Sequence, residues 1–296
     1  MIQILLRGGL GNQMFQYALG LQLALRNQTP LVLDTAYLDD RWPRQEFTFR
    51  NYDLDIFQFL PRFTFLSHCS QNFPIPGFWL ASDLFQSRLR TFAGYRWVRE
   101  KAECVFDPSV LNCGPKAVLW GYWQREEYFY GIESQLRQSF QFCHPLAGPA
   151  LQMQDSINAC SQSVSLHVRR GDHIQHSKVL TQQGDTDLNY YSMAAKHFSA
   201  RFTAPEFFIF SDDLDWCRQN LRLPGTMHFV DAECSGPKAS YHMQLMAQCR
   251  HHIIAKSSFS WWAAWLNTYS EKIVIAPRLW YRDGKPDPVP PQWLRY

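Results

Sequence analysis

Two adjacent arginines, Arg169 and Arg170, follow the apolar run "SVSLHV" (residues 163–168) in the stretch "HVRRGDH". A guanidinium group binds a phosphate through parallel hydrogen bonds, and two arginines are costly to hold close together in a loop unless an anion binds them. The pair therefore predicts a site for a phosphate or diphosphate group. The alternative is a pair of solvated arginines that point in opposite directions.

A second candidate phosphate site lies in the stretch "AKSSFSWWAAWLN" (residues 255–267). Ser257 and Ser258 stand where a helix is expected to begin, and the first turn of a helix offers free backbone N–H groups beside the serine hydroxyls. Trp261 and Trp265 are four residues apart, so we expect them on the buried face of that helix. The serines therefore predict a phosphate contact and the tryptophans a core contact.

Acidic residues in the stretch "FSDDLDW" admit two interpretations. Asp213 and Asp215 have the Asp-x-Asp spacing of the metal site of many sugar-nucleotide enzymes. However, Ser211, Asp212 and Asp213 also stand where a helix is expected to begin, and capping of its free N–H groups explains them without a metal. We favour the capping interpretation and predict no metal site.

A glycine-rich turn, "RGGLGNQMFQYA" (residues 7–18), follows the apolar run "IQILL" near the start of the chain. Gly9 and Gly11 fit the first positions of the dinucleotide fingerprint Gly-x-Gly-x-x-Gly, and Asp34 fits the acidic residue expected about twenty residues later. Met14 occupies the third glycine position, and its bulk disfavours an NAD or FAD site. That site stays a minor alternative, as does a turn that only joins a strand to a helix.

Two consecutive side-chain amides, Asn12 and Gln13, distinguish this turn from a plain connection between a strand and a helix. An amide side chain supplies hydrogen-bond donors beside those of the backbone. The turn is therefore expected to contact a ligand.

Alternating strand-like and helix-like runs must position these residues. The expected strands of the second half are residues 163–168, 206–211, 227–230, 252–255 and 272–276, and the expected helices are residues 188–202, 213–221, 241–251 and 257–267. Such alternation predicts a parallel sheet with crossover helices, and the first half begins in the same way. Because ligands bind outside the carboxyl ends of strands in open α/β sheets, the arginines, aspartates and serines are expected at one edge.

Length and composition bound the number of domains. With 296 residues, 46% of them hydrophobic and 19% charged, the chain is globular and long enough for one large or two ordinary domains. A proline-containing segment favours a boundary near residue 150. We therefore expect domains at 1–150 and 151–276, followed by a proline-rich tail at 277–296, with irregular structure and loops between residues 37 and 99.

Charge and cysteine content exclude several classes of protein. A net charge of +3, without a run of basic residues, does not favour a nucleic-acid partner. The eight cysteines are scattered, which predicts neither a zinc site nor a disulfide framework. No apolar run reaches the roughly 18 residues of a membrane span. We expect a cytoplasmic protein, and contact with the inner face of the membrane stays open.

Five motifs, "GGLGNQMFQYA", "GYWQREEYF", "HVRRGDH", "FSDD" and "SSFSWWAAWLN", occur in the order and spacing of the bacterial α-1,2-fucosyltransferases. The chain resembles this family over nearly its whole length. The resemblance implies a GT-B-like α/β fold with two Rossmann-like domains facing a cleft, the first on the acceptor side and the second holding the donor. It further implies inverting transfer of L-fucose from GDP-β-L-fucose to the 2-hydroxyl of a galactose-terminated glycan, without a metal or other cofactor.

The resemblance also assigns site residues. It implies that Arg169 grips the pyrophosphate of the donor and that the donor-binding set is Asn12, His167, Arg169, Arg170, Asp212, Ser257, Ser258 and Phe259. For the reaction itself, Arg169 would stabilise the leaving group, while Asp172 and Glu126 are the candidates for a base, one in each domain. A dissociative transition state would need no strong base.

Three positions depart from the family pattern. His173 stands where the family usually has Tyr, and Lys256 where it usually has Asn. His242 replaces an Asp that would be a guanine partner. Either Asp231 or Glu233 takes over that role, or guanine is recognised differently.

Other classes of protein stay open on the sequence alone. One is a non-catalytic protein that binds a sugar nucleotide or a glycan through its aromatic residues, which make up 16% of the chain. Another is a transferase that uses a different GDP-sugar, and a third is an NAD-dependent enzyme built on Gly9, Gly11 and Asp34. The sequence defines neither the acceptor glycan nor the oligomeric state.

Overall fold

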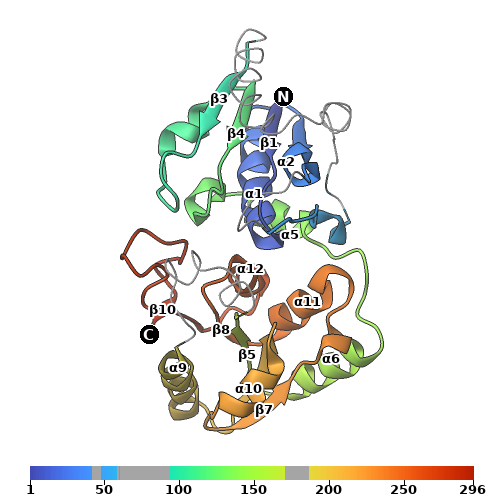
Figure 1. Cartoon of the computed structure of the whole chain (residues 1–296), viewed down its shortest axis with the longest axis vertical. Helices are drawn as coiled ribbons and strands as arrows, with labels where there is room; N and C mark the ends of the chain where they lie inside the picture. Colours follow the sequence, from blue (N-terminus) through green and yellow to red (C-terminus); the bar gives the residue numbers. More distant parts are fainter. Residues whose placement is uncertain (42–47, 59, 61–93, 171–186) are drawn as a thin grey trace. The chain divides into compact units, whose positions relative to one another are not determined.

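The chain divides into two compact α/β units. A computed structural model describes residues 1–41, 48–58, 60, 94–170 and 187–296 (Figure 1). Unit 1 consists of Met1–Gln141 and Pro286–Pro288, and unit 2 of Phe142–Lys285 and Val289–Tyr296. The chain thus passes from one unit to the next ahead of residue 150, and its proline-rich tail contributes residues to both units.

Unit 1 is built on a four-stranded parallel sheet in the order β2-β1-β4-β3. Its strands are β1 (Ile2–Leu5), β2 (Leu31–Asp34), β3 (Arg96–Arg99) and β4 (Ala117–Trp120). Helix α1 (Leu10–Arg26) connects β1 to β2 and buries an almost continuous run of residues along its length. Since the strands are parallel, their carboxyl ends share one edge, and the glycine-rich turn after β1 lies at that edge.

The remaining elements of unit 1 are short. They are α2 (Ala36–Asp39), the 3-10 helices η1 (Leu54–Ile56), η2 (Pro108–Asn112) and η3 (Glu126–Phe129), and α5 (Glu133–Ser139). Helix α5 buries Leu136. Strand β3 lies within residues 37–99, a region predicted to be irregular. The sequence does not predict this strand, because its four residues carry exposed arginines at both ends and have no apolar periodicity.

Unit 2 is built on a six-stranded parallel sheet in the order β10-β9-β8-β5-β6-β7. Its strands are β5 (Ser163–Val168), β6 (Glu206–Ser211), β7 (Thr226–Phe229), β8 (His251–Ile253), β9 (Val274–Ala276) and β10 (Leu294–Arg295). Its helices are α6 (Pro149–Ala159), α9 (Leu188–Arg201), α10 (Leu214–Asn220), α11 (Ser240–Gln248) and α12 (Ser258–Leu266), with the 3-10 helices η4 (Ala232–Cys234) and η5 (Pro237–Ala239). Helix α6 occupies part of the segment interpreted as a boundary, with a proline in its first turn where no N–H donor is needed.

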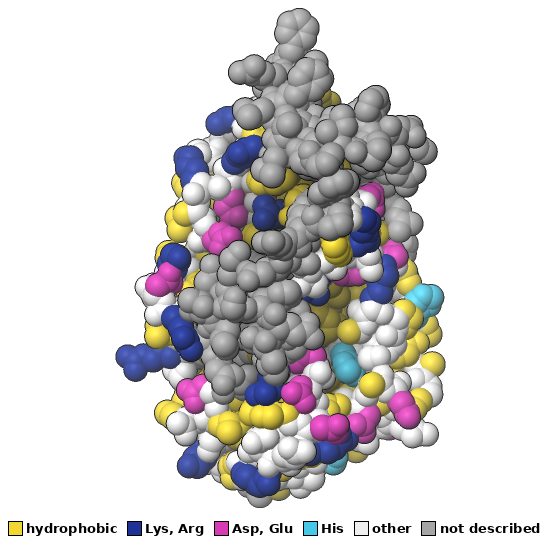
Figure 2. Space-filling view, viewed as in Figure 1, with side chains coloured by type: hydrophobic (Ala, Val, Ile, Leu, Met, Phe, Trp, Pro, Cys, Tyr) yellow, Lys and Arg dark blue, Asp and Glu magenta, His cyan; other side chains and the backbone are white. Residues whose placement is uncertain are grey.

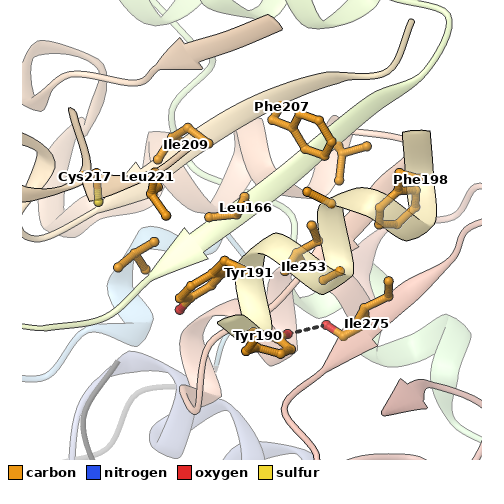
Figure 3. Packing of buried hydrophobic residues seen from close by; sticks show 14 residues of the cluster. Leu166, Tyr190, Tyr191, Phe198, Phe207, Ile209, Cys217, Leu221, Ile253 and Ile275 are labelled. Atoms are coloured by element: carbon orange, nitrogen blue, oxygen red, sulfur yellow. Dashed lines mark hydrogen bonds between the residues drawn. The ribbon is translucent and has the colours of Figure 1, made fainter. Parts of the chain in front are cut away.

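Alternation along β5 and β6 divides the side chains of unit 2 between two faces of the sheet. On one face, Leu166 of β5 and Ile209 of β6 pack against α9 and α10 in a fully buried cluster (Figure 3). Tyr190 of α9 spans this core and donates its hydroxyl hydrogen bond to the carbonyl of Ile254 (2.7 Å) or of Ile275 (3.0 Å). On the other face, His167 contacts α12.

The surface mixes charges of both signs. On the face drawn in Figure 2, lysines and arginines lie close to aspartates and glutamates among the coloured side chains. None of the helices in the described part of the chain has the length and apolar character that crossing a membrane requires.

Candidate donor site in unit 2

The arginine pair stands where β5 ends, beside the aspartate that follows β6. Arg169 Nη1 lies 2.9 Å from Asp212 Oδ2, and both side chains are about a quarter exposed (29% and 24%). The backbone N–H of Arg170 donates to Asp212 Oδ1 at 2.8 Å. One carboxylate therefore holds the arginine loop against the end of the neighbouring strand, as the sequence predicted for a shared edge.

The two arginines have different surroundings. Arg170 Nε donates to Asp213 Oδ2 at 3.1 Å, and its guanidinium lies 3.8 Å from the ring centroid of Trp216. Its side chain is only 15% exposed. A stacked and ion-paired guanidinium is held by the protein itself, so Arg170 has less freedom than Arg169 to bind a ligand.

The acidic cluster is confirmed as a helix cap at Asp213. Asp213 Oδ1 accepts from the backbone N–H of Trp216 at 3.1 Å and so caps α10, while Asp215 lies 3.5 Å from Arg218. Among the residues that the structure describes, no group of three or more His, Cys, Asp and Glu side chains is placed to hold a metal ion.

The predicted phosphate-binding serines lie at the start of α12, in the loop that follows β8, a neighbour of β5. Ser257 is the N-cap, and its Oγ accepts from the backbone N–H of Phe259 at 3.3 Å. Ser257, Ser258 and Phe259 are partly exposed, whereas Trp261 is fully buried. The first turn of α12 is therefore accessible while its tryptophan face belongs to the core, and Trp265, which is 4% exposed, confirms this division.

His167 connects the arginine loop to α12. Its ring centroid lies 5.9 Å from that of Phe259, and the residue is 6% exposed. Burial, with the nearby positive charge of Arg169, lowers the pKa of His167 to about 3, so the imidazole is neutral near pH 7. Its Nδ1 is buried without a hydrogen-bond partner.

His242, which replaces the expected aspartate, lies in α11 beside the end of β6. Its ring packs edge-on against Phe210 with centroids 5.7 Å apart, and its Nε2 is 3.3 Å from the backbone oxygen of Asp231. Burial lowers the pKa of His242, which keeps the ring neutral. The carboxylate of Asp231 accepts from Arg218 at 2.5 Å, and Glu233 is exposed in η4.

In unit 1, the paired amides of the glycine-rich turn have separate partners. Asn12 Oδ1 accepts from Gln124 Nε2 at 2.7 Å. Gln13 is fully buried, donates to the carbonyls of Gly8 (2.9 Å) and Asn51 (2.8 Å), and accepts from the backbone N–H of Asp53 (2.9 Å). Gln13 thus holds the turn together, and only Asn12 stays a candidate for a ligand contact.

Asp34 does not serve as the ribose-binding residue of a dinucleotide site. It is fully buried, and its carboxylate accepts from Gln3 Nε2 at 2.7 Å and from the backbone N–H of Ala36 at 3.0 Å. These bonds fix the end of β2 and remove the main support for the NAD interpretation.

Of the two candidate bases, the structure describes one, Glu126. Glu126 begins η3 in unit 1 and is partly buried. Asp172 lies outside the described residues, as does His173. The assignment of either carboxylate as a base stays a prediction.

Sequence reasoning missed a cavity of about 240 Å³ in unit 1, whose walls include Phe106, Trp123 and Tyr128. Trp123 is fully buried with a φ of 58°, and its backbone N–H donates to Glu100 Oε1 at 3.1 Å. The residue types in the stretch "GYWQ" do not predict that Trp123 has a left-handed backbone conformation.

Parallel α/β units, with an arginine loop and a helix N-terminus on adjacent strands of one sheet, have the architecture in which ligands bind outside the carboxyl ends of the strands. The chain belongs to Glycosyl transferase family 11, which it matches over residues 1–287. It is therefore a glycosyltransferase. The predicted fold class, GT-B-like with two Rossmann-like units, is confirmed, whereas their arrangement about a cleft stays a prediction.

Individual relatives are similar over different lengths. The Alpha-1,2-colitosyltransferase of Escherichia coli is 30% identical over 98% of this chain and 97% of that protein. The Galactoside alpha-(1,2)-fucosyltransferase 1 of Bos taurus is 30% identical over 47% of this chain and 40% of that protein. The crystal structure of fucosyltransferase NodZ from Bradyrhizobium shares 16% identity and a TM-score of 0.47 over 88% of this chain and 91% of that one.

Proposed function

We propose that this glycosyltransferase moves L-fucose from GDP-β-L-fucose to the 2-hydroxyl of a galactoside in an oligosaccharide, with inversion to an α-1,2 linkage. The observation that carries the proposal is the contact between His167 and Phe259, because it joins the loop of Arg169 to the first turn of α12. Two sources of positive potential thus meet at one edge of the sheet of unit 2, where a diphosphate would bind. The printed names of the Escherichia coli and Bos taurus relatives support the α-1,2 linkage.

In this mechanism the acceptor hydroxyl attacks the anomeric carbon from the face opposite to the leaving GDP. The bond from the anomeric carbon to the phosphate oxygen breaks as the new bond forms, and negative charge develops on the diphosphate. Arg169 and the N–H groups at the start of α12 would stabilise that charge. Charge-assisted hydrogen bonds of this kind contribute roughly 1.5–3 kcal/mol each.

A base would accept the proton of the acceptor hydroxyl and contribute roughly 10²–10⁴-fold in rate. Glu126 and Asp172 are the proposed candidates. Glu126→Gln and Asp172→Asn, made separately, should identify the base by a loss of kcat with little change in KM for the donor. If both variants retain the native kcat, neither residue is the base.

Recognition of guanine is proposed to differ from the family pattern. The carboxylate of Asp231 is engaged with Arg218, which does not favour it as a replacement for the missing aspartate. His242 and His167 are both neutral and lie near Phe210 and Phe259, respectively, so hydrogen bonds and ring contacts are both available to a base.

Calorimetric titration with GDP, GDP-fucose, UDP and NAD in the presence of EDTA tests the donor site. Binding of the guanine nucleotides alone, weakened in Arg169→Ala, is the expected result. Arg222→Ala is the matched control, because the hydrogen bonds of the Arg222 side chain within the described residues go to the backbone carbonyls of Arg218 and Leu221 in its own segment. Binding of UDP or NAD in preference to GDP would reject the proposed donor.

The identity of the transferred sugar needs a separate experiment, because one relative that spans the whole chain is a colitosyltransferase. Initial rates with GDP-fucose and GDP-colitose on a shared galactoside acceptor distinguish the two donors. A higher kcat/KM for GDP-colitose would support a transferase of a different GDP-sugar. Binding of both donors without transfer or hydrolysis would instead support a non-catalytic protein.

A further inference from the structure

Arg7 lies at the carboxyl edge of the sheet of unit 1, between β1 and the glycine-rich turn. Three aromatic rings surround its guanidinium, with centroids 4.3 Å (Tyr122), 5.4 Å (Trp120) and 5.6 Å (Tyr37) from Cζ. Tyr37 belongs to α2, Trp120 ends β4, and Tyr122 follows it. We call these four residues the Arg7 cluster. Two other segments of the chain therefore place aromatic rings around this cation.

Buried polar contacts hold the Arg7 cluster in place. Gln16 is fully buried in α1, accepts from the backbone N–H of Arg7 at 3.0 Å and donates to the carbonyl of Gly121 at 3.0 Å. Glu100 Oε2 accepts from the backbone N–H of Tyr122 at 2.7 Å. The bonds of Gln16 tie the end of β1 to the turn after β4, and the bond of Glu100 ties the end of β3 to the same turn. The cluster is a built feature of the edge rather than a surface side chain lying on nearby rings.

The guanidinium has more donors than the described residues satisfy. Its Nη2 donates to the hydroxyl of Tyr122 at 3.3 Å, and its Nε is buried without an acceptor. Within the described part of the chain, no carboxylate forms an ion pair with Arg7. Glu100 is near, but its two oxygens accept from the backbone N–H groups of Tyr122 and Trp123. Aromatic faces attract the cation without accepting its directional hydrogen bonds.

The local electrostatic field also favours an anion. Helix α1 begins directly after the turn, and the N-terminus of a 17-residue helix carries partial positive charge. Its first turn contains no acidic residue, and its N-cap Gly9 offers no side-chain cap. Arg7 adds its positive charge to this end of the helix, and the nearby Glu100 carboxylate offsets part of it. A Cβ placed on Gly9 would meet no atom of the described residues within 4 Å, so the turn is open at this position.

We propose that the Arg7 cluster binds an oxyanion, a carboxylate or phosphate group of a sugar substrate. The three rings surround a guanidinium, which is a group that binds carboxylate and phosphate oxygens. Under the proposed function, two substrates could supply the same chemistry: an acidic group on the acceptor glycan or the diphosphate of the donor. The experiment below distinguishes these two sources.

Binding is measured without turnover, by ligand-observed NMR and calorimetry on the full chain. The acceptor probes are methyl galactoside, methyl galacturonoside and galactose 6-phosphate, and the donor probe is GDP. The variants are Arg7→Gln and Arg7→Lys. The control is Arg26→Gln, at the opposite end of α1, where Arg26 bonds Asn112 at the surface.

If the acceptor supplies the oxyanion, the acidic galactosides bind the native chain at least about tenfold more tightly than methyl galactoside. Arg7→Gln then removes this preference and Arg7→Lys retains part of it. If the donor supplies it, Arg7→Gln weakens GDP by a similar factor and no acidic preference exists. The proposal is overturned if Arg7→Gln and Arg26→Gln bind every probe like the native chain.

Two further readouts keep the test decisive. If Arg7→Gln does not fold, Arg7→Lys and Tyr122→Phe are measured, and native binding by both folded variants overturns the proposal. The proposed function is tested independently, because its failure appears as a native chain that does not bind GDP. An acidic preference in such a chain would still support the Arg7 cluster.

Discussion

The two adjacent arginines of unit 2 should respond to substitution in opposite ways. Arg169→Ala is expected to weaken GDP and to leave the stability of the fold nearly unchanged. Arg170→Ala is expected to destabilise unit 2, because Arg170 is mostly buried between Asp213 and Trp216. A sequence alone treats the two residues as equivalent.

The magnitudes follow from their contacts. Arg170→Ala removes a charge-assisted hydrogen bond to Asp213, worth about 1.5–3 kcal/mol, and a cation–π contact worth about 0.5–2 kcal/mol. We expect a loss of about 2–5 kcal/mol in the free energy of unfolding. The pair of Arg169 with Asp212 is partly exposed and contributes about 1 kcal/mol or less. Loss of one charge-assisted bond to a diphosphate corresponds to a roughly tenfold to hundredfold weaker GDP complex.

Urea denaturation and calorimetric titration with GDP measure both quantities for each variant. Arg170→Lys is a useful companion, because it keeps the charge and loses the planar contact with Trp216. The reasoning is refuted if Arg169→Ala unfolds at lower urea than Arg170→Ala, or if the two variants weaken GDP equally while both retain native stability.

Three other predictions concern packing and protonation. Because the pKa of His167 in the folded chain is about 3, below its usual value near 6.5, the unfolded chain takes up the proton first; stability should therefore fall as the pH drops from about 6.5 towards 3, at about 1.4 kcal/mol per pH unit, and His167→Gln should reduce that slope in pH-dependent denaturation. Gly121→Ala should cost about 1–3 kcal/mol, because its Cβ would overlap Glu100 and lie 2.9 Å from Trp123 Cε2, whereas Gly9→Ala, with a φ of −81° and open space, should keep the native Tm; equal Tm values would contradict this. Gln13→Leu should cost about 1–3 kcal/mol for each buried backbone group that it leaves unbonded, with Gln22→Leu, which loses one surface contact, as the control in thermal unfolding.

The second half of the fold follows closely from its sequence pattern. The run "SVSLHV" is β5 without any shift, and the helix expected from Leu188 is α9. Buried strands of a parallel sheet are short and continuously apolar, so their signal depends little on distant residues. The expected helix at 241–251 is too long, because α11 ends at Gln248 and β8 begins at His251. Histidine is not a residue type that predicts the start of a strand.

The elements that sequence patterns do not predict depend on pairing between distant residues. Strand β3 exists because its backbone pairs with β4, which supplies the order that its own residues lack. Strand β10 has only two residues, both exposed, and forms by pairing with β9. Such strands are specified by a partner rather than by their own periodicity.

The sequence predicts which residue types form the candidate site, but it does not predict which contacts each residue makes. The capping role of Asp213 follows from its position before a helix, and the structure confirms it. The contact of Arg170 with Trp216 is invisible in the sequence, because it depends on the spatial neighbourhood of β5 and α10. The Arg7 cluster was likewise missed, since its four members come from three separate segments of the chain.

The closely packed tryptophans of α12 should give the protein a strong near-ultraviolet circular dichroism signal. Trp261 and Trp262 have ring centroids 5.0 Å apart, Trp262 and Trp265 5.2 Å, and Trp261 and Trp293 5.4 Å. Indoles held this close in a chiral arrangement couple their electronic transitions and produce strong near-ultraviolet circular dichroism. The same helix presents Ser257 and Ser258 at its start. The spectrum therefore offers a label-free signal by which occupancy at that end of the helix can be followed in solution.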